Sequence, residues 1–519
     1  MTAAGPWPPD PVVYEVYVRS FADADGDGVG DLAGLRARLP HLARLGVDAV
    51  WVTPFYPSPM ADHGYDVADP YGVDPLFGDL DAFAAVLDDA HALGLRVVVD
   101  VVPNHVSRAH PWFVEALADP ASPLRERFVF RDAPDGARPN DWQSTFGGPA
   151  WTQAPDGAWY LHLFDSGQPD LQWRHPDVPA YWLDVLRTWL DRGVDGFRID
   201  VAHALFKRAD LADEGPLGAP PDGVPHERRH VWDCDEVLGV YEDWRRLVDG
   251  YDPPRLLVGE VFLYGQERVA EYVGPTRLHQ AFDFTVMRAP YDAAALREAV
   301  RGALAHLDPP TWVLSNHDLV RHATRYGGGA LGVRRGLSVT AFLLALPGSP
   351  YLYQGEELGL EEADLPDAVR QDPVFLRTGG AQRGRDGCRT PLPWDAAAPG
   401  LGFTTGTPWL PPGPDAAAKA VAQQEGDPGS TLAAYRALLA LRRDLRAGLG
   451  RGVAWLDAPD DVLAVRREGG LVAVLNTAGG AVEVAVDGTL LTATAPGAAV
   501  AGGVLTVPAA ATAWLRAPG

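Results

Sequence analysis

The segment RVVVDVVPNH, at residues 96–105, is a run of β-branched apolar residues that leads into Asn104 and His105. A strand that is apolar on both faces is buried on both faces, which is typical of a parallel sheet covered by helices. Polar residues at its carboxyl end then lie at the edge where such sheets present their functional side chains. The segment therefore predicts an inner strand that leads directly into a site.

Seven further short apolar runs share this character and alternate with amphipathic stretches. They lie at residues 12–18, 48–54, 196–202, 255–261, 281–286, 311–316 and 349–355. The stretches between them, such as 35–46 and 181–193, carry apolar residues at helical spacing. Eight consecutive βα units predict the α/β class and a (β/α)8 TIM barrel. An open, doubly wound sheet shows the same alternation and stays an alternative on the pattern alone.

Two segments depart from the alternation. Residues 104–175, rich in Pro, Trp, Asp and Gly, separate the third and fourth strands by more chain than a crossover needs, so we expect an inserted subdomain there. Residues 451–519 follow a last amphipathic helix at 431–446 and carry short alternating runs between turn residues, which predicts a C-terminal antiparallel β domain. The barrel would then comprise residues 1–103 and 176–450.

The composition limits the class of partner. The 519 residues carry a formal net charge of −25, which repels nucleic acid and anionic membranes, so we expect a small neutral substrate instead. No run reaches the ~20 apolar residues of a membrane span, and the N-terminus lacks the pattern of a signal peptide. We therefore expect a cytoplasmic protein, and its oligomeric state, monomer or homodimer, stays open. Cys234 and Cys388, the only two cysteines, exclude a disulfide framework, and we expect both to be reduced.

Three other predicted strands also end in ionisable residues. The fourth carries Arg198 and Asp200 at alternate positions, so both side chains point to the same face. The fifth ends at Glu260 and the seventh at His317 and Asp318. Any one of these residues alone would be more typical of a structural salt bridge. Because the strand ends of a barrel converge, the set favours one shared site, to which Asp100 and His105 of the third strand also contribute.

These residue types suit the hydrolysis of a glycosidic bond. That reaction needs an ionised carboxylate at the anomeric carbon and a protonated acid at the leaving oxygen. Arg198 would keep Asp200 ionised by pairing with it. Neighbouring carboxylates and partial desolvation would favour the protonated form of Glu260. Neutral His105 and His317 would donate hydrogen bonds to sugar hydroxyls.

Four motifs, DVVPNH, GFRIDVAHA, GEVF and SNHD, resemble in order and spacing the four blocks shared by the α-amylase superfamily, glycoside hydrolase family 13. QPDLQW (168–173), GYD (64–66) and RTPLPWD (389–395) resemble segments of its α-glucosidase and oligo-1,6-glucosidase branch. The resemblance covers essentially the whole chain. It implies a barrel with an insertion after the third strand and a C-terminal β domain.

The resemblance also implies a function and a set of site residues. The chain would be a retaining, exo-acting α-glucosidase that removes terminal α-linked glucose from short oligosaccharides or α-glucosides. Asp200 would be the nucleophile, Glu260 the acid/base and Asp318 the stabiliser of the transition state. The residues that would hold the sugar in a closed pocket are Asp62, Tyr65, His105, Phe164, Gln168, Arg198, His317 and Arg389.

Within that pocket, Tyr65 would stack on the sugar ring, while Asp62 and Arg389 would bind the hydroxyl at the non-reducing end. A surface ion pair away from the site is the alternative for these two. Val201, after the nucleophile, tends in the resembling enzymes to accompany α-1,6 preference, whereas His203 replaces their usual Asn.

The long Pro/Gly/charged loop at 209–236 would be either a plain solvated loop or a wall over the leaving-group side that limits substrates to short oligosaccharides. A glucosyl transferase or isomerase of the same superfamily, trehalose synthase-like or sucrose-active, stays open. A non-catalytic sugar-binding relative fits less well, because such relatives lose the catalytic acids and gain a membrane span. A debranching or branching enzyme also fits less well, because it would carry an extra N-terminal β domain.

An acidic loop follows the first predicted strand. Asp23, Asp25 and Asp27 alternate with other residues and imitate the start of an EF-hand, but Gly34 stands where the bidentate Glu would be. The loop resembles the calcium loop of oligo-1,6-glucosidases. This resemblance implies a structural Ca²⁺, with Mg²⁺ or a merely solvated acidic turn as alternatives. We expect no organic cofactor. The implied ligands are Asp23, Asp25, Asp27, Val29 and Asp31.

Overall fold

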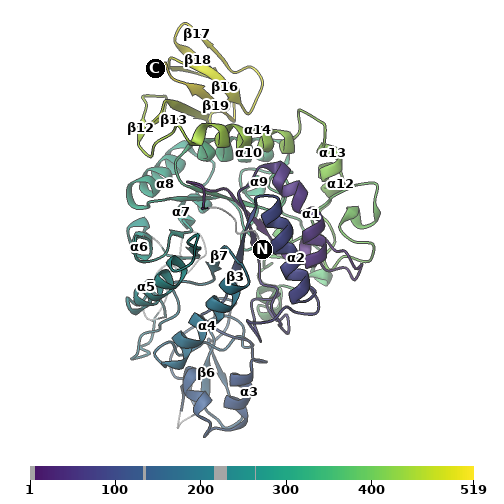
Figure 1. Cartoon of the computed structure of the whole chain (residues 1–519), viewed down its shortest axis with the longest axis vertical. Coiled ribbons are helices and arrows are strands. Elements are labelled where there is room, and N and C mark those ends of the chain that lie inside the picture. The colour runs from purple at the N-terminus through teal and green to yellow at the C-terminus, as the bar shows by residue number, and fades with distance from the viewer. Residues whose placement is uncertain (1–5, 133–135, 216–230, 264, 519) are drawn as a thin grey trace.

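The computed structural model describes residues 6–132, 136–215, 231–263 and 265–518. Its centre is an eight-stranded parallel sheet in the order β10-β11-β1-β2-β3-β7-β8-β9, which curls around the middle of the molecule (Figure 1). The strands are β1 (Val13–Val16), β2 (Ala49–Val52), β3 (Arg96–Val101), β7 (Gly196–Ile199), β8 (Leu256–Gly259), β9 (Gln280–Ala281), β10 (Thr311–Val313) and β11 (Ser349–Tyr353). The hydroxyl of Thr311 on β10 donates to the carbonyl of Ala281 on β9 at 2.7 Å and links the two ends of that order. The predicted (β/α)8 barrel is confirmed.

Side chains along the strands alternate between the barrel interior and the surrounding helices. On β3, Val98 packs in the interior cluster, whereas Val97 and Val99 pack outward. Asp100, two residues beyond Val98, therefore points inward as well. Its register partner on β7 is Arg198. The alternation thus places an acidic and a basic side chain, Asp100 and Arg198, side by side in the barrel interior near the carboxyl ends of the strands.

One helix follows each barrel strand and covers the sheet from outside. The helix N-caps match local sequence: the side chains of Asp31, Asp79 and Asp292 accept backbone N–H groups at the starts of their helices. The covering helices are α1 (Leu32–Leu45), α2 (Leu80–Ala92), α4 (Asp177–Asp191), α5 (Glu236–Asp249), α6 (Gln266–Tyr272), α8 (Ala293–His306), α10 (Gly329–Ala345) and α14 (Thr431–Arg446).

The chain between β3 and α4 forms a small unit at one end of the molecule, the lower end in Figure 1. It contains α3 (Pro111–Ala118) and an antiparallel sheet in the order β4-β6-β5. The strands of this sheet are β4 (Phe130–Arg131), β5 (Trp151–Gln153) and β6 (Trp159–Leu161). The bridge between His105 and Asp170 ties the two ends of this inserted segment together. Its side chains are therefore held against the carboxyl ends of the barrel strands.

Two antiparallel sheets form the C-terminal part, at the opposite end of Figure 1. They have the orders β12-β13-β14-β19-β16 and β15-β18-β17 and share one apolar core. The indole N–H of Trp514 donates to the carbonyl of Ala341 on α10 at 2.9 Å, which docks this part on the barrel. The strands are β12 (Val453–Trp455), β13 (Val462–Arg467), β14 (Leu471–Asn476), β15 (Val482–Ala485), β16 (Thr489–Ala493), β17 (Ala499–Ala501), β18 (Val504–Val507) and β19 (Ala511–Arg516).

The sixth predicted strand differs from its prediction. Of residues 281–286, only Ala281 belongs to β9, and α7 (Phe284–Arg288) begins three residues later. The reason is local, because the side chain of Asp283 accepts the N–H of Thr285 and caps the new helix. The apolar run FTV is consequently helical.

The remaining short helices lie in the loops after the seventh and eighth barrel strands. They are α9 (His322–Arg325), α11 (Pro373–Arg377), α12 (Ala416–Lys419) and α13 (Val421–Gln424).

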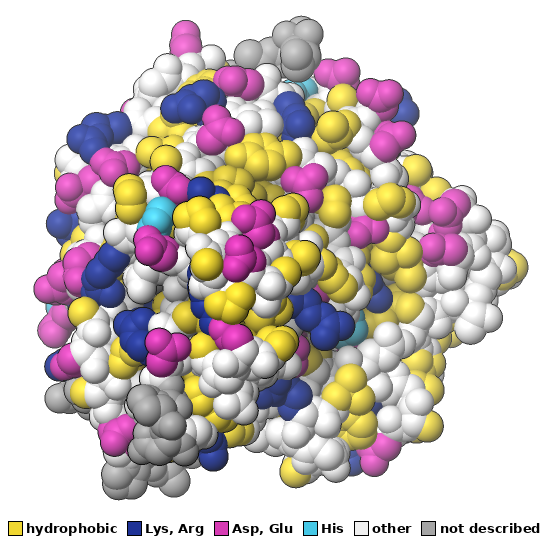
Figure 2. Space-filling view, turned by 90° about the horizontal axis from the view of Figure 1, so that it is seen from below, with side chains coloured by type: hydrophobic (Ala, Val, Ile, Leu, Met, Phe, Trp, Pro, Cys, Tyr) yellow, Lys and Arg dark blue, Asp and Glu magenta, His cyan; other side chains and the backbone are white. Residues whose placement is uncertain are grey.

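Further predictions concern the cysteines, membrane spans, one long loop and the surface charge. Cys234 and Cys388 are both free thiols, as predicted. Among the described residues, no helix has the length and hydropathy needed to cross a bilayer. Of the loop at 209–236, for which a solvated loop and a wall over the leaving-group side were both open, residues 216–230 lie outside the described residues. The face in Figure 2 carries acidic side chains with basic and apolar ones among them, so its negative charge is not gathered in a single patch.

Candidate active site

Arg198 is the centre of a cluster of three carboxylates at the carboxyl ends of β3, β7 and β8. Its Nη1 donates to Asp100 Oδ1 at 2.9 Å and to Asp200 Oδ1 at 2.7 Å. Its Nη2 lies 2.8 Å from Glu260 Oε2. The guanidinium is fully buried, and the three acids are at most 9% exposed. The structure thus brings the predicted nucleophile and acid/base to two nitrogens of one side chain.

The turn after β7 holds Asp200 and Glu260 together. Val201 has a φ of +44°, an unfavourable conformation for a β-branched residue. In this conformation its N–H donates to Glu260 Oε2 at 3.0 Å. The N–H of Ala202 donates to the carbonyl of Glu260 at 3.0 Å. Backbone strain next to the two acids therefore fixes the position of the Glu260 carboxyl.

One guanidinium cannot neutralise three carboxylates, so the cluster retains protons. Burial raises the pKa of Asp200 well above its ordinary value, Arg198 opposes this, and the nearby Glu260 and Asp100 add to the rise. Burial likewise raises the pKa of Asp100 to about 6, against the pull of Arg198. Arg198 pairs with Asp200 as predicted, but it is shared with Asp100 and Glu260, so its ability to keep Asp200 ionised stays a prediction.

Asp318 lies opposite this cluster and is held by two arginines. Its Oδ1 accepts from Arg389 Nη2 at 2.8 Å and from Arg385 Nη1 at 3.0 Å. Burial alone would raise the pKa of Asp318, but His317 and the two guanidinium groups hold it well below its usual range. Asp318 is accordingly ionised while Asp200 and Asp100 compete for protons.

A buried chain of hydrogen bonds orients His317. Burial raises the pKa of Glu15 well above its ordinary value and lowers that of His317 well below its ordinary value. The carboxyl of Glu15 and Nδ1 of the ring are in contact and share a hydrogen bond. The other nitrogen, Nε2, lies 3.3 Å from Asp318 Oδ2. Glu15 is a site residue that sequence reasoning missed, although its place on β1 follows from the strand alternation.

Arg385 closes the far end of the site. Its Nη2 donates to Asp62 Oδ1 at 2.6 Å, and its Nε donates to Asp372 Oδ2 at 2.6 Å. Arg389, predicted to bind the terminal sugar hydroxyl together with Asp62, is instead fully buried, pairs with Asp318 and donates to the carbonyl of His317 at 2.8 Å. The motif GRDGCRT places two arginines four residues apart, and of these two it is Arg385 that donates to Asp62.

The predicted sugar-binding residues from the inserted segment and from the loop after β2 lie beside the Arg198 cluster and the pair of Asp62 and Arg385. The ring of Tyr65 is parallel to that of His317 at 5.1 Å, and its hydroxyl donates to Asp100 Oδ2 at 3.0 Å. His105 packs against Phe164 at 5.2 Å, and burial lowers the pKa of His105 to about 4, so its ring is neutral. Gln168 donates to Asp62 Oδ2 at 3.1 Å.

A cavity of about 480 Å³ opens among these residues. This volume suits a small oligosaccharide or glycoside. Arg198, Gln168 and Arg389 were predicted to line it but lie behind the wall, each 0% exposed, and contact the residues that do line it. The predicted residues in the wall are Asp62, Tyr65, His105, Phe164, Asp200, Glu260, His317 and Asp318.

The wall on the Glu260 side is mostly aromatic. Trp232 in it belongs to the loop at 209–236, for which a wall on the leaving-group side was one of two interpretations, whereas Phe262 and Phe284 were not predicted. The wall contains Trp232, Phe262 and Phe284, with His203 between them and the acids. The rings of Phe262 and Phe284 lie 4.5 Å apart. Phe146, on the inserted segment, and Arg385 complete the opposite rim and contact each other at 4.9 Å. The lining is thus charged around Asp62 and Arg385 and mostly aromatic beside Glu260, where the guanidinium of Arg288 lies 4.4 Å from the ring of Phe262.

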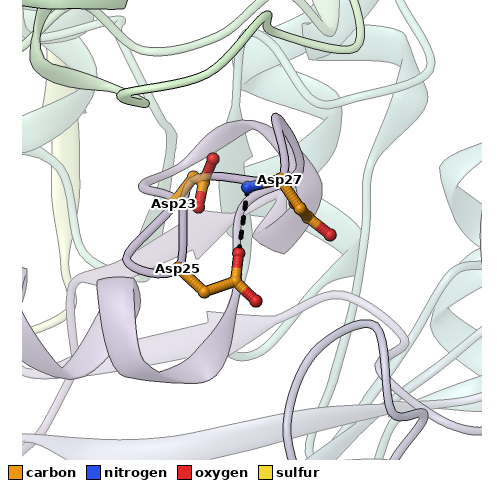
Figure 3. Close-up of side chains that lie close together, drawn as sticks. All are labelled: Asp23, Asp25 and Asp27. Carbon is orange, nitrogen blue, oxygen red and sulfur yellow. Dashed lines mark hydrogen bonds between the residues drawn. The ribbon is translucent and has the colours of Figure 1, made fainter.

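The acidic loop lies apart from this cavity. Asp23, Asp25 and Asp27 gather with their carboxylate oxygens within 4.8 Å of one another (Figure 3). Partial burial and the neighbouring Asp25 and Asp23 raise the pKa of Asp27, against the N–H of Val29. Three like charges at this distance suit a divalent cation with oxygen ligands.

Asp31 does not join the group of three. Its Oδ1 accepts the N–H of Gly34 at 2.6 Å as the N-cap of α1, and its Oδ2 accepts the N–H of Ala24 at 2.9 Å. The role of Asp31 as a ligand stays a prediction, because a carboxylate oxygen that accepts an N–H keeps a further lone pair. No contact places the carbonyl of Val29 relative to the three acids.

Known proteins resemble this chain over most of its length. Residues 15–448 match the family described as "Alpha amylase, catalytic domain". A probable alpha-glucosidase of Rhizobium meliloti (strain 1021) is 42% identical over 452 residues, which covers 83% of this chain and 82% of that protein. An oligo-1,6-glucosidase of Parageobacillus thermoglucosidasius is 33% identical over 476 residues, with 84% of each chain covered.

Two solved structures resemble the whole chain. The alpha-glucosyl transfer enzyme XgtA superposes with a TM-score of 0.91 at 40% identity, over 98% of this chain and 100% of that one. A mutant of the trehalulose synthase MutB superposes with a TM-score of 0.89 at 29% identity, over 99% and 100% of the two chains.

Proposed function

The chain belongs to the α-amylase family of glycoside hydrolases, in the branch of the α-glucosidases and oligo-1,6-glucosidases, and from this premise we propose that it is a retaining, exo-acting α-glucosidase. Its substrates are short oligosaccharides or small α-glucosides. The observation that carries the proposal is that Asp200 and Glu260 share the guanidinium of Arg198 at 2.7 and 2.8 Å at the wall of a cavity. Two carboxyl groups held this closely suit the ~5–5.5 Å separation of a retaining site.

The reaction has two steps. Asp200 attacks the anomeric carbon and forms a covalent glucosyl ester, while the bond to the leaving oxygen breaks and Glu260 gives its proton to that oxygen. Glu260 then takes a proton from water, whose oxygen attacks the same carbon and releases Asp200. Two inversions restore the α configuration. Ionised Asp318 stabilises the positive charge that develops on the ring in both steps.

The closed end of the cavity supports exo cleavage. Asp62 and Arg385 form an ion pair of 2.6 Å across this end, and Phe146 covers Arg385. A chain of further sugars has no path past that pair, so only a terminal glucose reaches Asp200. The hydroxyl at the non-reducing end replaces part of the hydrogen bonding between the two side chains.

Transfer of glucose to another sugar is the second candidate function. One solved structure at 40% identity is an alpha-glucosyl transfer enzyme. The aromatic wall formed by Trp232, Phe262 and Phe284 supports this candidate, because apolar surface favours an acceptor sugar over water next to the glucosyl ester. Hydrolysis and transfer share the first step and differ only in the acceptor.

The proposal is tested by NMR of the first products from maltose, isomaltose, sucrose and trehalose, assayed side by side. We expect α-glucose as the initial sugar product and little activity on long starch. The share of glucose that appears in new glucosides measures transfer. An initial β product, or cleavage inside long chains, would contradict the retaining exo mechanism.

The buried acids predict an acid limb in the pH profile. Burial raises the pKa of Asp62 to about 6, against Arg385 and Arg389, and Asp100 has the same pKa for the same reason. Both accept hydrogen bonds in their ionised forms. Protonation of Asp62 therefore weakens the binding of the sugar, and protonation of Asp100 weakens its ion pair with Arg198. We expect kcat/KM to fall as the pH decreases through about 6, measured with a substrate that has no ionisable group. Asp62→Asn should make this limb shallower, and a flat profile down to pH 4.5 would refute it.

We further propose that Asp23, Asp25 and Asp27 bind Ca²⁺ in a structural role, with Mg²⁺ as the weaker alternative. The cation would stabilise the loop by neutralising the three carboxylates. Removal of metal with a chelator and dialysis should lower the melting temperature by a few degrees, on the order expected for the loss of one specific ligand. Added Ca²⁺ should restore it.

The matched variants for that test are Asp25→Asn and Glu483→Gln, the latter on β15 in the C-terminal sheets. Asp25→Asn should abolish the response of the melting temperature to Ca²⁺, and Glu483→Gln should keep it. An unchanged melting temperature after verified metal removal means that the loop is a solvated acidic turn.

A further inference from the structure

Trp409 lies behind the closed end of the cavity, in the loop that precedes α12. Among the described residues it is not part of the cavity wall. Its partly buried ring packs against the cluster of Tyr17, Tyr353 and Cys388. Its backbone N–H donates to the carbonyl of Gly28 at 2.9 Å, so the acidic loop also holds it in place. Three lines of contact lead from this position to the closed end.

The first line leads from the indole through Ser20 to Arg389. The indole N–H of Trp409 donates to Ser20 Oγ at 3.0 Å. The hydroxyl of Ser20 in turn donates to the carbonyl of Arg389, with which it is in contact. Arg389 Nη2 then donates to Asp318 Oδ1, the atom that also accepts from Arg385. Ser20 and Arg389 are both 0% exposed, so solvent does not replace these bonds.

The second line leads through His63 to Asp62. The ring of His63 is buried and lies 5.3 Å from that of Trp409. His63 has a φ of +52°, in the left-handed region where a residue with a side chain is strained. Such strain persists only where the surroundings hold it. Among the described residues neither ring nitrogen of His63 has a hydrogen-bond partner, so packing against Trp409 helps to hold the ring and the adjacent Asp62.

The third line leads from the carbonyl of Trp409 to Arg385. That carbonyl accepts from Gln371 Nε2 at 2.9 Å. The backbone N–H groups of Gln371 and Asp372 donate to Asp386 Oδ2 at 2.7 and 3.0 Å. Asp372 Oδ2 accepts from Arg385 Nε at 2.6 Å. The loop that carries Arg385 is thus tied to the same tryptophan.

We propose that Trp409 is a positioning residue, which holds Asp62 and Arg385 where they bind the hydroxyl at the non-reducing end of the terminal glucose. The inference rests on the proposed glucosidase or transglucosidase function. Trp409 acts without touching the sugar, because the three lines of contact all end at this pair or at the atom of Asp318 that Arg385 binds. A hydrogen bond weakens steeply with distance and angle, so a small displacement of the pair loses the hydroxyl.

The test compares glucose and 4-deoxyglucose as competitive inhibitors of the native enzyme and its variants. The two sugars differ only in the C4 hydroxyl, which is the one at the non-reducing end. The substrate is whichever of maltose, isomaltose, sucrose or trehalose the native enzyme cleaves fastest. For the native enzyme we expect the inhibition constant of 4-deoxyglucose to exceed that of glucose about tenfold or more, the size of one hydrogen bond to a charged group.

The variants break the lines of contact one at a time. Trp409→Phe keeps a ring beside His63 but removes the N–H that Ser20 accepts, and Ser20→Ala breaks the same bond from the other side. We expect each to lower the ratio of the two inhibition constants about threefold. Trp409→Ala also removes the packing on His63 and should bring the ratio close to one. A merely structural role would lower the yield or kcat and leave this ratio unchanged.

Trp394→Phe is the matched control. The indole N–H of Trp394 donates to the carbonyl of Phe21 at 2.7 Å, next to Ser20 in the chain. An arginine lies over each of the two tryptophan rings, and a histidine packs against each. The histidine beside Trp394 is His41, on α1, and not His63. Trp394→Phe should therefore keep the native ratio of inhibition constants.

The two levels of the proposal fail differently. If the native protein cleaves none of the four disaccharides, the proposed function itself fails. If the native enzyme is active and distinguishes the two sugars, but Trp409→Phe and Ser20→Ala keep the native ratio, the inference about Trp409 is overturned. These two variants each remove one hydrogen bond, so they decide the question even if Trp409→Ala does not fold. An active native enzyme that binds both sugars equally overturns the inference as well.

Discussion

Asp200→Asn will lower kcat by about 10⁴-fold or more, with the fold intact. Asn has the shape of Asp but cannot form the glucosyl ester, so the first step loses its nucleophile. The substitution is well suited to the site, because an amide oxygen can still accept from Arg198 Nη1, now 2.7 Å from Asp200 Oδ1. Near-native turnover of maltose or of an aryl glucoside would remove the assignment.

Chemical rescue separates loss of the nucleophile from damage to the fold. Asp200→Gly leaves a hole beside the anomeric carbon that azide can enter. With α-glucosyl fluoride as substrate, azide attacks from the side of the missing carboxylate, fluoride leaves, and the product is β-glucosyl azide. Asp249→Asn serves as the control, because this exposed carboxylate pairs with Arg245 at the end of α5 and should leave turnover near native.

Much of this site could be predicted from the strands alone. The period of two along a strand places Asp100 above Val98, and Arg198 and Asp200 on one face of β7, which the interior packing confirms. Convergence of strand ends then brings Glu260 and Asp318 to the same cavity. Such predictions succeed because they depend on backbone geometry, which is regular in a parallel barrel.

Side-chain pairings in the loops could not be predicted in the same way. Two arginines, Arg385 and Arg389, are both plausible partners for Asp62, and only the path of the loop decides that Arg385 reaches it. Asp31, predicted as a ligand, also caps α1 with Oδ1 and accepts the N–H of Ala24 with Oδ2. In each case two roles compete for one side chain, and sequence spacing does not rank them.

The protonation of the cluster is also a property of the three-dimensional arrangement. From sequence, Arg198 and Asp200 form a simple pair. In the structure Arg198 is divided among Asp100, Asp200 and Glu260, all largely buried. A substrate that enters and expels water changes this balance, because the positive charge that develops at the anomeric carbon favours ionised Asp200. The proton that the three carboxyl groups retain is then available for transfer to the leaving oxygen.

Glu260→Ala will lower kcat for disaccharides by about 10³-fold or more, and far less for the first step with α-glucosyl fluoride. A sugar alkoxide leaves only when it is protonated, whereas fluoride leaves without a proton. The contrast between the two substrates identifies the acid, since removal of a merely structural carboxyl would affect both. Equal losses for both substrates would therefore assign Glu260 to the support of Arg198, which lies 2.8 Å from its Oε2, instead of to proton transfer.

The same variant reports the second step. Without a base to activate water, the glucosyl ester on Asp200 accumulates and can be found by mass spectrometry of the intact protein. Azide needs no base, so it should attack the ester, restore turnover and give α-glucosyl azide, the product of two inversions. Asp200→Gly gives the β anomer under the same conditions, so the two variants are distinguished by the configuration of one product. The same anomer from both would show that the roles of the two acids are assigned wrongly.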